Sequence, residues 1–101
     1  MHPSPRSASP REVRVPLGRL VATTKALELL KATGTNPAAL LSRHHTGDWG
    51  DIDPEDQATN DASLRHGHRV ISSYRLNPHD TLWIITEADR SVTTLLLPDE
   101  Y

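Results

Sequence analysis

Two adjacent histidines and the short loop after them are the densest group of chemically active residues in this chain of 101 residues. Imidazole groups exchange protons near neutral pH, and loops held by a rigid scaffold concentrate binding and catalytic residues. The segment therefore predicts a general base or a ligand-binding loop. The residues concerned are His44 and His45, followed by Gly47, Asp48, Trp49, Gly50 and Asp51.

A structural interpretation of the same segment stays open. Trp49 can fill the core while the glycines make the turns around it, since glycine adopts positive φ at little cost. One of the two histidines can cap the C-terminal end of a helix, where the helix dipole favours a positive charge, while the other is exposed. On this interpretation the loop determines the fold and carries no chemistry.

A metal site is a weaker alternative. On this hypothesis His66 and His68 supply nitrogen ligands and His45 and Asp48 complete the set, which zinc accepts. Their spacing matches no compact ligand motif, so we expect neither a metal nor a cofactor. The chain also contains no cysteine, which excludes a disulfide framework, a thiol nucleophile and cysteine-ligated zinc.

Arginine and hydroxyl side chains in the C-terminal half form a second candidate group. Residues at alternate positions of a strand share one face, so Arg69, Ser73 and Arg75 lie together, and Thr94 follows in a later strand. A histidine that moves protons, opposite arginines that stabilise a phosphate, is an arrangement that phosphodiester chemistry uses. With His45 as the base, this pattern predicts an RNase-like site; an ordinary solvated sheet face is the alternative.

A third group lies in the turn that follows the second of the expected C-terminal strands. Glu87, Asp89 and Arg90 are expected to form an ion pair that fixes this turn rather than a catalytic carboxylate site. The chain contains no Walker loop, dinucleotide-binding or nucleophile-elbow motif.

Charge is distributed unevenly along the chain. Residues 46–63 contain six acidic side chains and no lysine or arginine, which argues against a protein that wraps nucleic acid. No apolar run approaches the roughly 20 residues that span a bilayer, and residues 1–11 lack the apolar core of a secretory signal. We therefore expect a cytoplasmic protein without membrane contact, whose partner is another protein.

Capping residues and hydrophobic spacing predict three short helices in the first two thirds of the chain. They cover residues 25–32 after a Thr24 cap, residues 37–45 after an Asn36 cap, and residues 54–65 after an Asp53 cap, with glycines at positions 34, 47 and 67 as stops. The third helix has few apolar residues and carries Asn60 at its centre, where asparagine is unfavourable. It must therefore lie at the surface.

From residue 68 onward the pattern changes to a period of two. Residues 69–76, 81–87 and 92–97 read as strands, joined by turns of hairpin length. The expected fold is therefore α+β: two or three short helices and then a three-stranded antiparallel meander. A short N-terminal edge strand near residues 18–22 is an open addition. Residues 1–11 are expected to be a disordered tail, and residues 12–101 a single domain.

Four blocks of the sequence together form a recognisable pattern over roughly residues 20–101. They read HHxGDWGD from His44, RxxSxY from Arg69, WIITEADRSxTT from Trp83 and LPxEY from Leu97. The pattern resembles a family of small bacterial proteins found on plasmids and other mobile elements. The resemblance implies a bacterial accessory protein and no particular chemistry.

A weaker likeness, at the level of the fold, is to the RelE, barnase and EndoU-like group of small RNases. The chain departs from that group in its acidic net charge and in its incomplete catalytic set. The leading hypothesis is thus a non-catalytic interaction module. The alternative is a metal-independent RNase-like phosphodiesterase of the toxin kind, with RNA as substrate.

Overall fold

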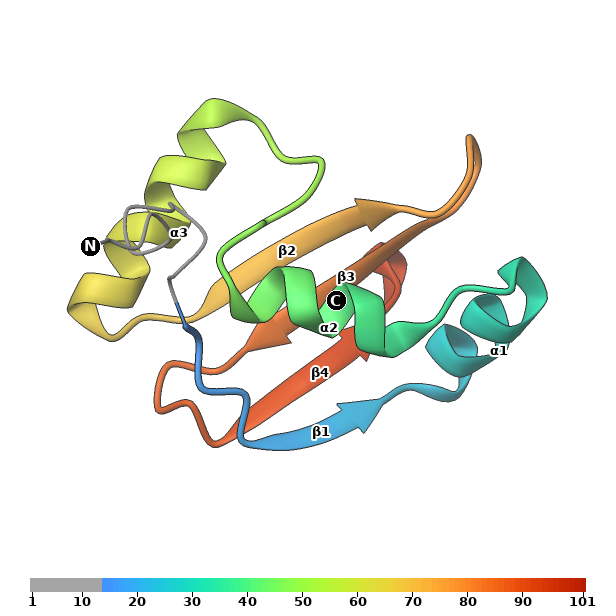
Figure 1. Ribbon diagram of the computed structural model, residues 1–101, viewed down its shortest axis with the longest axis horizontal. Helices are drawn as coiled ribbons and strands as arrows, with labels where there is room; N and C mark the ends of the chain where they lie inside the picture. The colour runs from blue at the N-terminus through green and yellow to red at the C-terminus, as the bar shows by residue number, and fades with distance from the viewer. Residues whose placement is uncertain (1–13) are drawn as a thin grey trace, which may run out of the picture.

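The computed structural model describes residues 14–101, and the predicted tail over residues 1–11 lies outside them. The elements follow one another in the order shown in Figure 1. They are β1 (Arg19–Ala22), α1 (Thr24–Thr33), α2 (Pro37–His45), α3 (Pro54–His66), β2 (Val70–Arg75), β3 (Thr81–Thr86), β4 (Val92–Leu96) and the short 3-10 helix η3 (Pro98–Glu100). The α+β class expected from the sequence is therefore confirmed.

The helix boundaries follow from their caps. The side chain of Thr23 accepts a hydrogen bond from the Ala26 amide at 3.0 Å, so α1 is capped one residue earlier than predicted. Asn36 caps α2 and Asp53 caps α3, as the sequence predicted, each followed by a proline that has no amide hydrogen to lose. Gly34 ends α1 in the left-handed region, where a residue without Cβ is least strained.

The sheet has the strand order β1-β4-β3-β2, and it corrects the predicted three-stranded meander in one respect. Strands β2, β3 and β4 pair antiparallel as expected. The N-terminal edge strand that the sequence left open is present as β1, and it makes the sheet mixed because it lies parallel to β4. Hairpin turns bring sequence neighbours together, and local pattern reveals them. The pairing of residues 19–22 with residues 92–95 joins distant parts of the chain, and no local signal predicts its direction.

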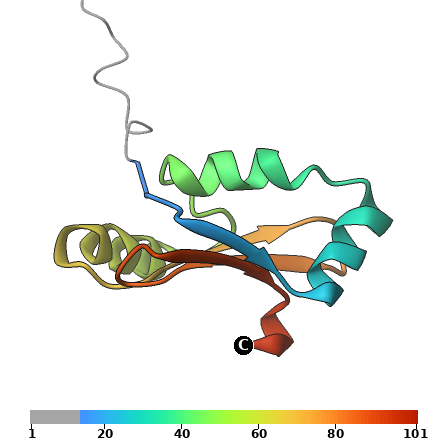
Figure 2. The same ribbon diagram turned by 90° about the horizontal axis from the view of Figure 1, so that it is seen from below.

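The sheet has one face covered by a helix and one that is not, as Figure 2 shows edge-on. Helix α2 lies across the first, which we call the covered face, and α3 lies beside the edge strand β2. The main core fills the space between the covered face, α1 and α2. Its buried members are Ala26, Leu30, Leu40, Tyr74, Leu82, Ile84 and Leu95.

The opposite face, here the outer face, carries the alternate residues of each strand. The C-terminal turn covers part of it, and the Tyr101 ring packs edge-on against Trp83 with centroids 5.7 Å apart. Arg69 lies over the same Tyr101 ring at 5.1 Å. The arginines and hydroxyls of the predicted RNase-like site lie on this outer face; they are Arg69, Ser73, Arg75 and Thr94.

Candidate functional site

His44 is fully buried, which corrects the expectation that one of the two histidines caps a helix end and the other is exposed. It projects from α2 onto the covered face of the sheet. Its Nδ1 lies 2.5 Å from Ser72 Oγ in β2, and its Nε2 lies 2.9 Å from Thr86 Oγ1 in β3. Both ring nitrogens are therefore occupied by partners within the fold.

The Leu17 carbonyl oxygen fixes the direction of the hydrogen bonds that lead to Nε2 of His44. Thr93 Oγ1 must donate to the Leu17 carbonyl oxygen, 2.7 Å away, because a carbonyl cannot donate. Thr93 then has no second hydrogen, so Thr86 donates across the 2.7 Å contact between their hydroxyls. Thr86 in turn accepts from Nε2–H of His44. Because burial keeps the imidazole neutral, Nδ1 carries no hydrogen and accepts from the Ser72 hydroxyl. The imidazole is therefore held in one tautomer.

Burial, and to a lesser extent the nearby charges of His45 and Arg90, lower the pKa of His44 to about 4. A neutral, inaccessible imidazole neither takes a proton from a substrate nor caps a helix dipole. His44 instead connects α2 to three strands of the sheet through hydroxyl groups. Its function is to hold the fold together.

The loop at residues 47–51 covers the free backbone edge of β2. Gly50 forms a parallel bridge with Ser73: the Ser73 amide donates to the Trp49 carbonyl at 3.0 Å, and the Asp51 amide donates to the Ser73 carbonyl at 2.6 Å. The Asp51 carboxylate then accepts from the Arg75 amide at 2.7 Å. Unpaired strand edges attract other chains, and this loop removes that exposure along half of β2.

Side chains of the same loop hold it in place. Asp48 pairs with Arg43 at 2.7 Å, and its carbonyl oxygen accepts from the Tyr74 hydroxyl at 2.6 Å. Trp49 is buried between Val15 and Val70. The structure therefore supports the structural interpretation of the tryptophan. Among the other residues of the loop, Asp51 is exposed, whereas Gly47, Asp48 and Gly50 are half-buried.

Asn60 completes the covering of β2 and explains the asparagine at the centre of α3. Its side-chain amide donates to the Ile71 carbonyl at 2.8 Å and its side-chain oxygen accepts from the Ile71 amide at 3.1 Å. The Asn60 side chain thus makes the pair of hydrogen bonds with Ile71 that the backbone of a neighbouring strand would make. The residue that sequence reasoning marked as locally unfavourable is the one that fixes α3 to the sheet.

The predicted base of the RNase-like site, His45, does not share a cleft with the arginines and hydroxyls of that site. His45 belongs to α2 above the covered face, where its Nδ1 lies 2.8 Å from the Val15 carbonyl oxygen. Arg69, Ser73 and Arg75 lie on the opposite, outer face. Thr94 lies there too, since it pairs in register with Ile85. Proton transfer needs contact at about 3 Å, directly or through one water, and the sheet separates these groups.

The turn at residues 87–91 is fixed differently from the predicted ion pair. Arg90 adopts φ 63° and donates to the carbonyl oxygens of Glu87 and His68, at 3.0 and 2.7 Å. Asp89 accepts from the amide and hydroxyl of Ser91. Arg90 therefore joins the turn to the end of α3 through backbone oxygens.

The histidines of the weaker metal hypothesis are also apart. The rings of His66 and His68 have centroids 6.5 Å from each other. Within residues 14–101 no group of three or more histidine, aspartate or glutamate side chains is arranged to hold a metal ion.

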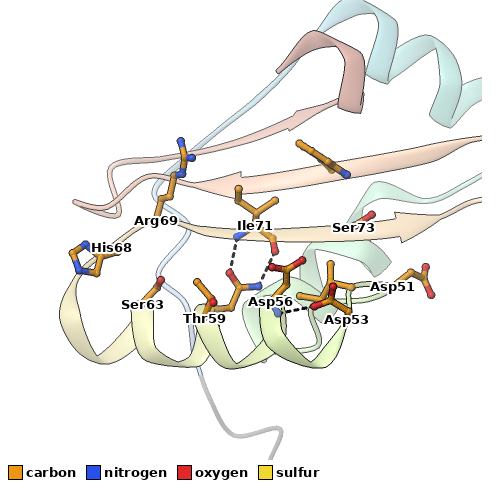
Figure 3. Close-up of a pocket in the computed structure, with 12 residues that line it drawn as sticks. Asp51, Asp53, Asp56, Thr59, Ser63, His68, Arg69, Ile71 and Ser73 are labelled. Atoms are coloured by element: carbon orange, nitrogen blue, oxygen red, sulfur yellow. Dashed lines mark hydrogen bonds between the residues drawn. The ribbon is translucent and has the colours of Figure 1, made fainter.

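A groove of about 850 Å³ lies between α3 and the outer face of the sheet, and it is the candidate binding site (Figure 3). Its volume is within the roughly 300–1,000 Å³ typical of ligand pockets. We call it the α3 groove. It is lined by Asp51, Ile52, Asp53, Asp56, Thr59, Asn60, Ser63, His68, Arg69, Ile71, Ser73 and Trp83.

The α3 groove has a charge of opposite sign at each end. Asp51, Asp53 and Asp56 stand at the beginning of α3, and Arg69 stands at the other end beside His68, as Figure 3 shows. Between them the floor is partly exposed apolar surface from Ile71 and Trp83. No ion pair within residues 14–101 neutralises the carboxylates of Asp53 and Asp56 or the guanidinium of Arg69.

Sequence reasoning found only part of this groove. It noted the acidic segment, Asp51, Arg69 and Ser73, but it assigned no role to Trp83, Ile71 or Thr59. The available signals were a tryptophan at an alternate strand position and a polar helix rich in carboxylates. Neither signal shows that the two elements lie side by side, because their contact joins separate parts of the chain.

No helix within the described residues is long and apolar enough to cross a membrane. Comparison of the chain with protein-family models, with curated proteins and with solved structures gave no match.

Proposed function

We propose that this protein is a non-catalytic interaction module that binds another protein in the α3 groove. The observation that carries the proposal is that some polar residues form hydrogen bonds within the fold while others are exposed in the α3 groove. His44 and the hydroxyls of Ser72 and Thr86 form hydrogen bonds inside the fold, and the loop at residues 47–51 pairs with β2. In the α3 groove, by contrast, the charged side chains are exposed and the apolar floor is partly exposed. Exposed polar and aromatic groups in a preformed cavity are typical of binding sites.

The cellular setting belongs to the same proposal. The blocks that resemble proteins of plasmids and mobile elements support a small accessory protein in the bacterial cytoplasm. A partner in that setting is another protein of the host or of the element. The acidic rim of the α3 groove favours a protein over RNA, because phosphates would meet Asp53 and Asp56.

The experiment is affinity capture from a bacterial lysate with the full chain and two matched variants. Thr59 lines the α3 groove and is exposed, so Thr59→Arg places a long charged side chain in the groove. Ala58 is its exposed neighbour and does not line the groove, so Ala58→Arg adds the same charge to the same helix outside it.

We expect the natural chain and Ala58→Arg to retain the same specific protein and Thr59→Arg to lose it. Circular dichroism and the urea midpoint check that both variants fold. Equal capture by all three proteins, or capture of RNA in place of protein, contradicts the proposal.

A further inference from the structure

The chemistry of the partner segment can be inferred from the α3 groove, and this inference rests on the proposed function. The edge of β2 is already paired by Gly50, Asp51 and Asn60. A bound segment therefore cannot add to the sheet as a further strand through backbone hydrogen bonds. Recognition must come from side chains that meet the rim and floor of the groove.

The length of the groove sets the spacing of those side chains. Arg69 and Ser73 mark its two ends along the strand, and four residues of strand span about 13 Å. Helix α3 runs beside this strand, with Asp53 near the Ser73 end and Ser63 near the Arg69 end (Figure 3). An extended segment of about five residues therefore reaches from one charged end to the other.

The charges set the identity of the end residues. Three carboxylates at one end attract a lysine or arginine, and the guanidinium of Arg69 attracts a carboxylate at the other. In an extended segment the first, third and fifth side chains point to the same side. The third residue then lies over Ile71 and Trp83, where apolar surface is half-buried and can be removed from water.

We propose that the α3 groove takes an extended segment of a partner protein with a lysine or arginine, an apolar residue and a carboxylate at alternate positions. Binding uses two ion pairs at the ends and apolar contact in the middle. The segment is recognised by its pattern of charge and not by a fold of its own.

The test is a titration of the full chain, labelled with nitrogen-15, followed by two-dimensional NMR. The probe is the pentapeptide Lys-Thr-Leu-Thr-Asp with acetylated and amidated ends, and the comparison peptide begins with Glu in place of Lys. The indole N–H of Trp83 reports on the groove, while that of buried Trp49 is the internal reference. We expect saturable shifts at Trp83 and an affinity about five-fold higher for the lysine peptide.

Two variants with the same change of charge locate the interaction. Asp56 lines the groove, and Asp56→Lys should weaken binding of the lysine peptide about five-fold. Glu55 is its exposed neighbour outside the groove, so Glu55→Lys should leave the affinity within about two-fold. Asp56 contributes its backbone amide to the Asp53 cap, and this hydrogen bond survives either substitution.

A charge exchange tests the other end of the groove. Arg69→Glu should weaken binding of Lys-Thr-Leu-Thr-Asp and strengthen binding of Lys-Thr-Leu-Thr-Lys. Equal affinity for the lysine and glutamate peptides, absence of shifts at Trp83, or equal effects of Asp56→Lys and Glu55→Lys would overturn the inference. Shifts caused by ten-nucleotide oligouridylate and strengthened by Asp56→Lys would overturn it in favour of RNA.

The two proposals fail separately. If the peptides show no preference while Thr59→Arg still abolishes capture, the groove binds a protein of different chemistry. If Thr59→Arg leaves capture unchanged as well, the proposed function itself is wrong.

Discussion

Acid should destabilise this protein through His44, and substitution of His44 should remove this contribution to the pH dependence of stability. Burial holds the pKa of His44 at about 4 in the folded protein, whereas an exposed histidine in the unfolded chain has a pKa of about 6.5. Between these values the unfolded chain binds a proton that the folded protein does not bind. The free energy of unfolding therefore falls as pH falls through this interval, and the contribution of His44 is intact only above it.

The magnitude follows from the two pKa values. Proton linkage predicts that His44 alone lowers the free energy of unfolding by about 2 kcal/mol between pH 7 and pH 5, and by about 3 kcal/mol at pH 4. A domain of this size is stable by roughly 5–15 kcal/mol, so the loss is easily measured. Urea denaturation at pH 7, 6 and 5, followed by circular dichroism, provides the free energies.

The variant His44→Gln isolates this contribution. Glutamine does not titrate, and its amide can donate to Thr86 while its carbonyl accepts from Ser72. The variant should be less stable at pH 7, with a loss between pH 7 and 5 that is about 2 kcal/mol smaller than in the natural chain. His79→Ala removes an exposed histidine and should keep the full pH dependence.

Two results would refute this reasoning. If His44→Gln loses as much stability between pH 7 and 5 as the natural chain, His44 is not held neutral by the fold. If His79→Ala instead removes the pH dependence, the titrating group lies at the surface.

Three further substitutions, Gly50→Ala, Asn60→Ala and Tyr74→Phe, test the covering of β2 by urea denaturation at pH 7, and Gly34→Ala and Thr59→Ala serve as controls. Gly34→Ala places a Cβ at φ 66° in open space and should lower the free energy of unfolding by about 1 kcal/mol. Gly50→Ala at φ 81° should lower it by about 3 kcal/mol or more, because the added Cβ overlaps the Ser73 carbonyl. Equal losses in the two variants would show that the loop does not approach β2. Asn60→Ala leaves the Ile71 amide and carbonyl unpaired and should cost about 2 kcal/mol and accelerate hydrogen exchange of that amide, while Thr59→Ala should do neither. Tyr74→Phe removes the bond to the Asp48 carbonyl and should cost about 1 kcal/mol, and an unchanged midpoint would contradict the bond's contribution.

The sequence by itself determined the local structure of this protein. Thr, Asn and Asp caps, prolines at first helical positions and glycines at helix ends are signals that act within a few residues. The helices therefore begin and end close to where they were predicted, Asn36 and Asp53 among the caps. The change of period after residue 68 likewise located β2, β3 and β4, and the short turns set their antiparallel pairing.

Only the tertiary structure decided how distant residues are used. His44 was expected at a helix end, but its burial depends on hydroxyls of β2 and β3 that lie 28 and 42 positions away. Asn60 looked unfavourable because its partner, Ile71, belongs to another element. The local sequence pattern shows which secondary structure residues close in sequence prefer. The enclosed core, the parallel pairing of β1 and the α3 groove form instead where segments distant in sequence meet and exclude water.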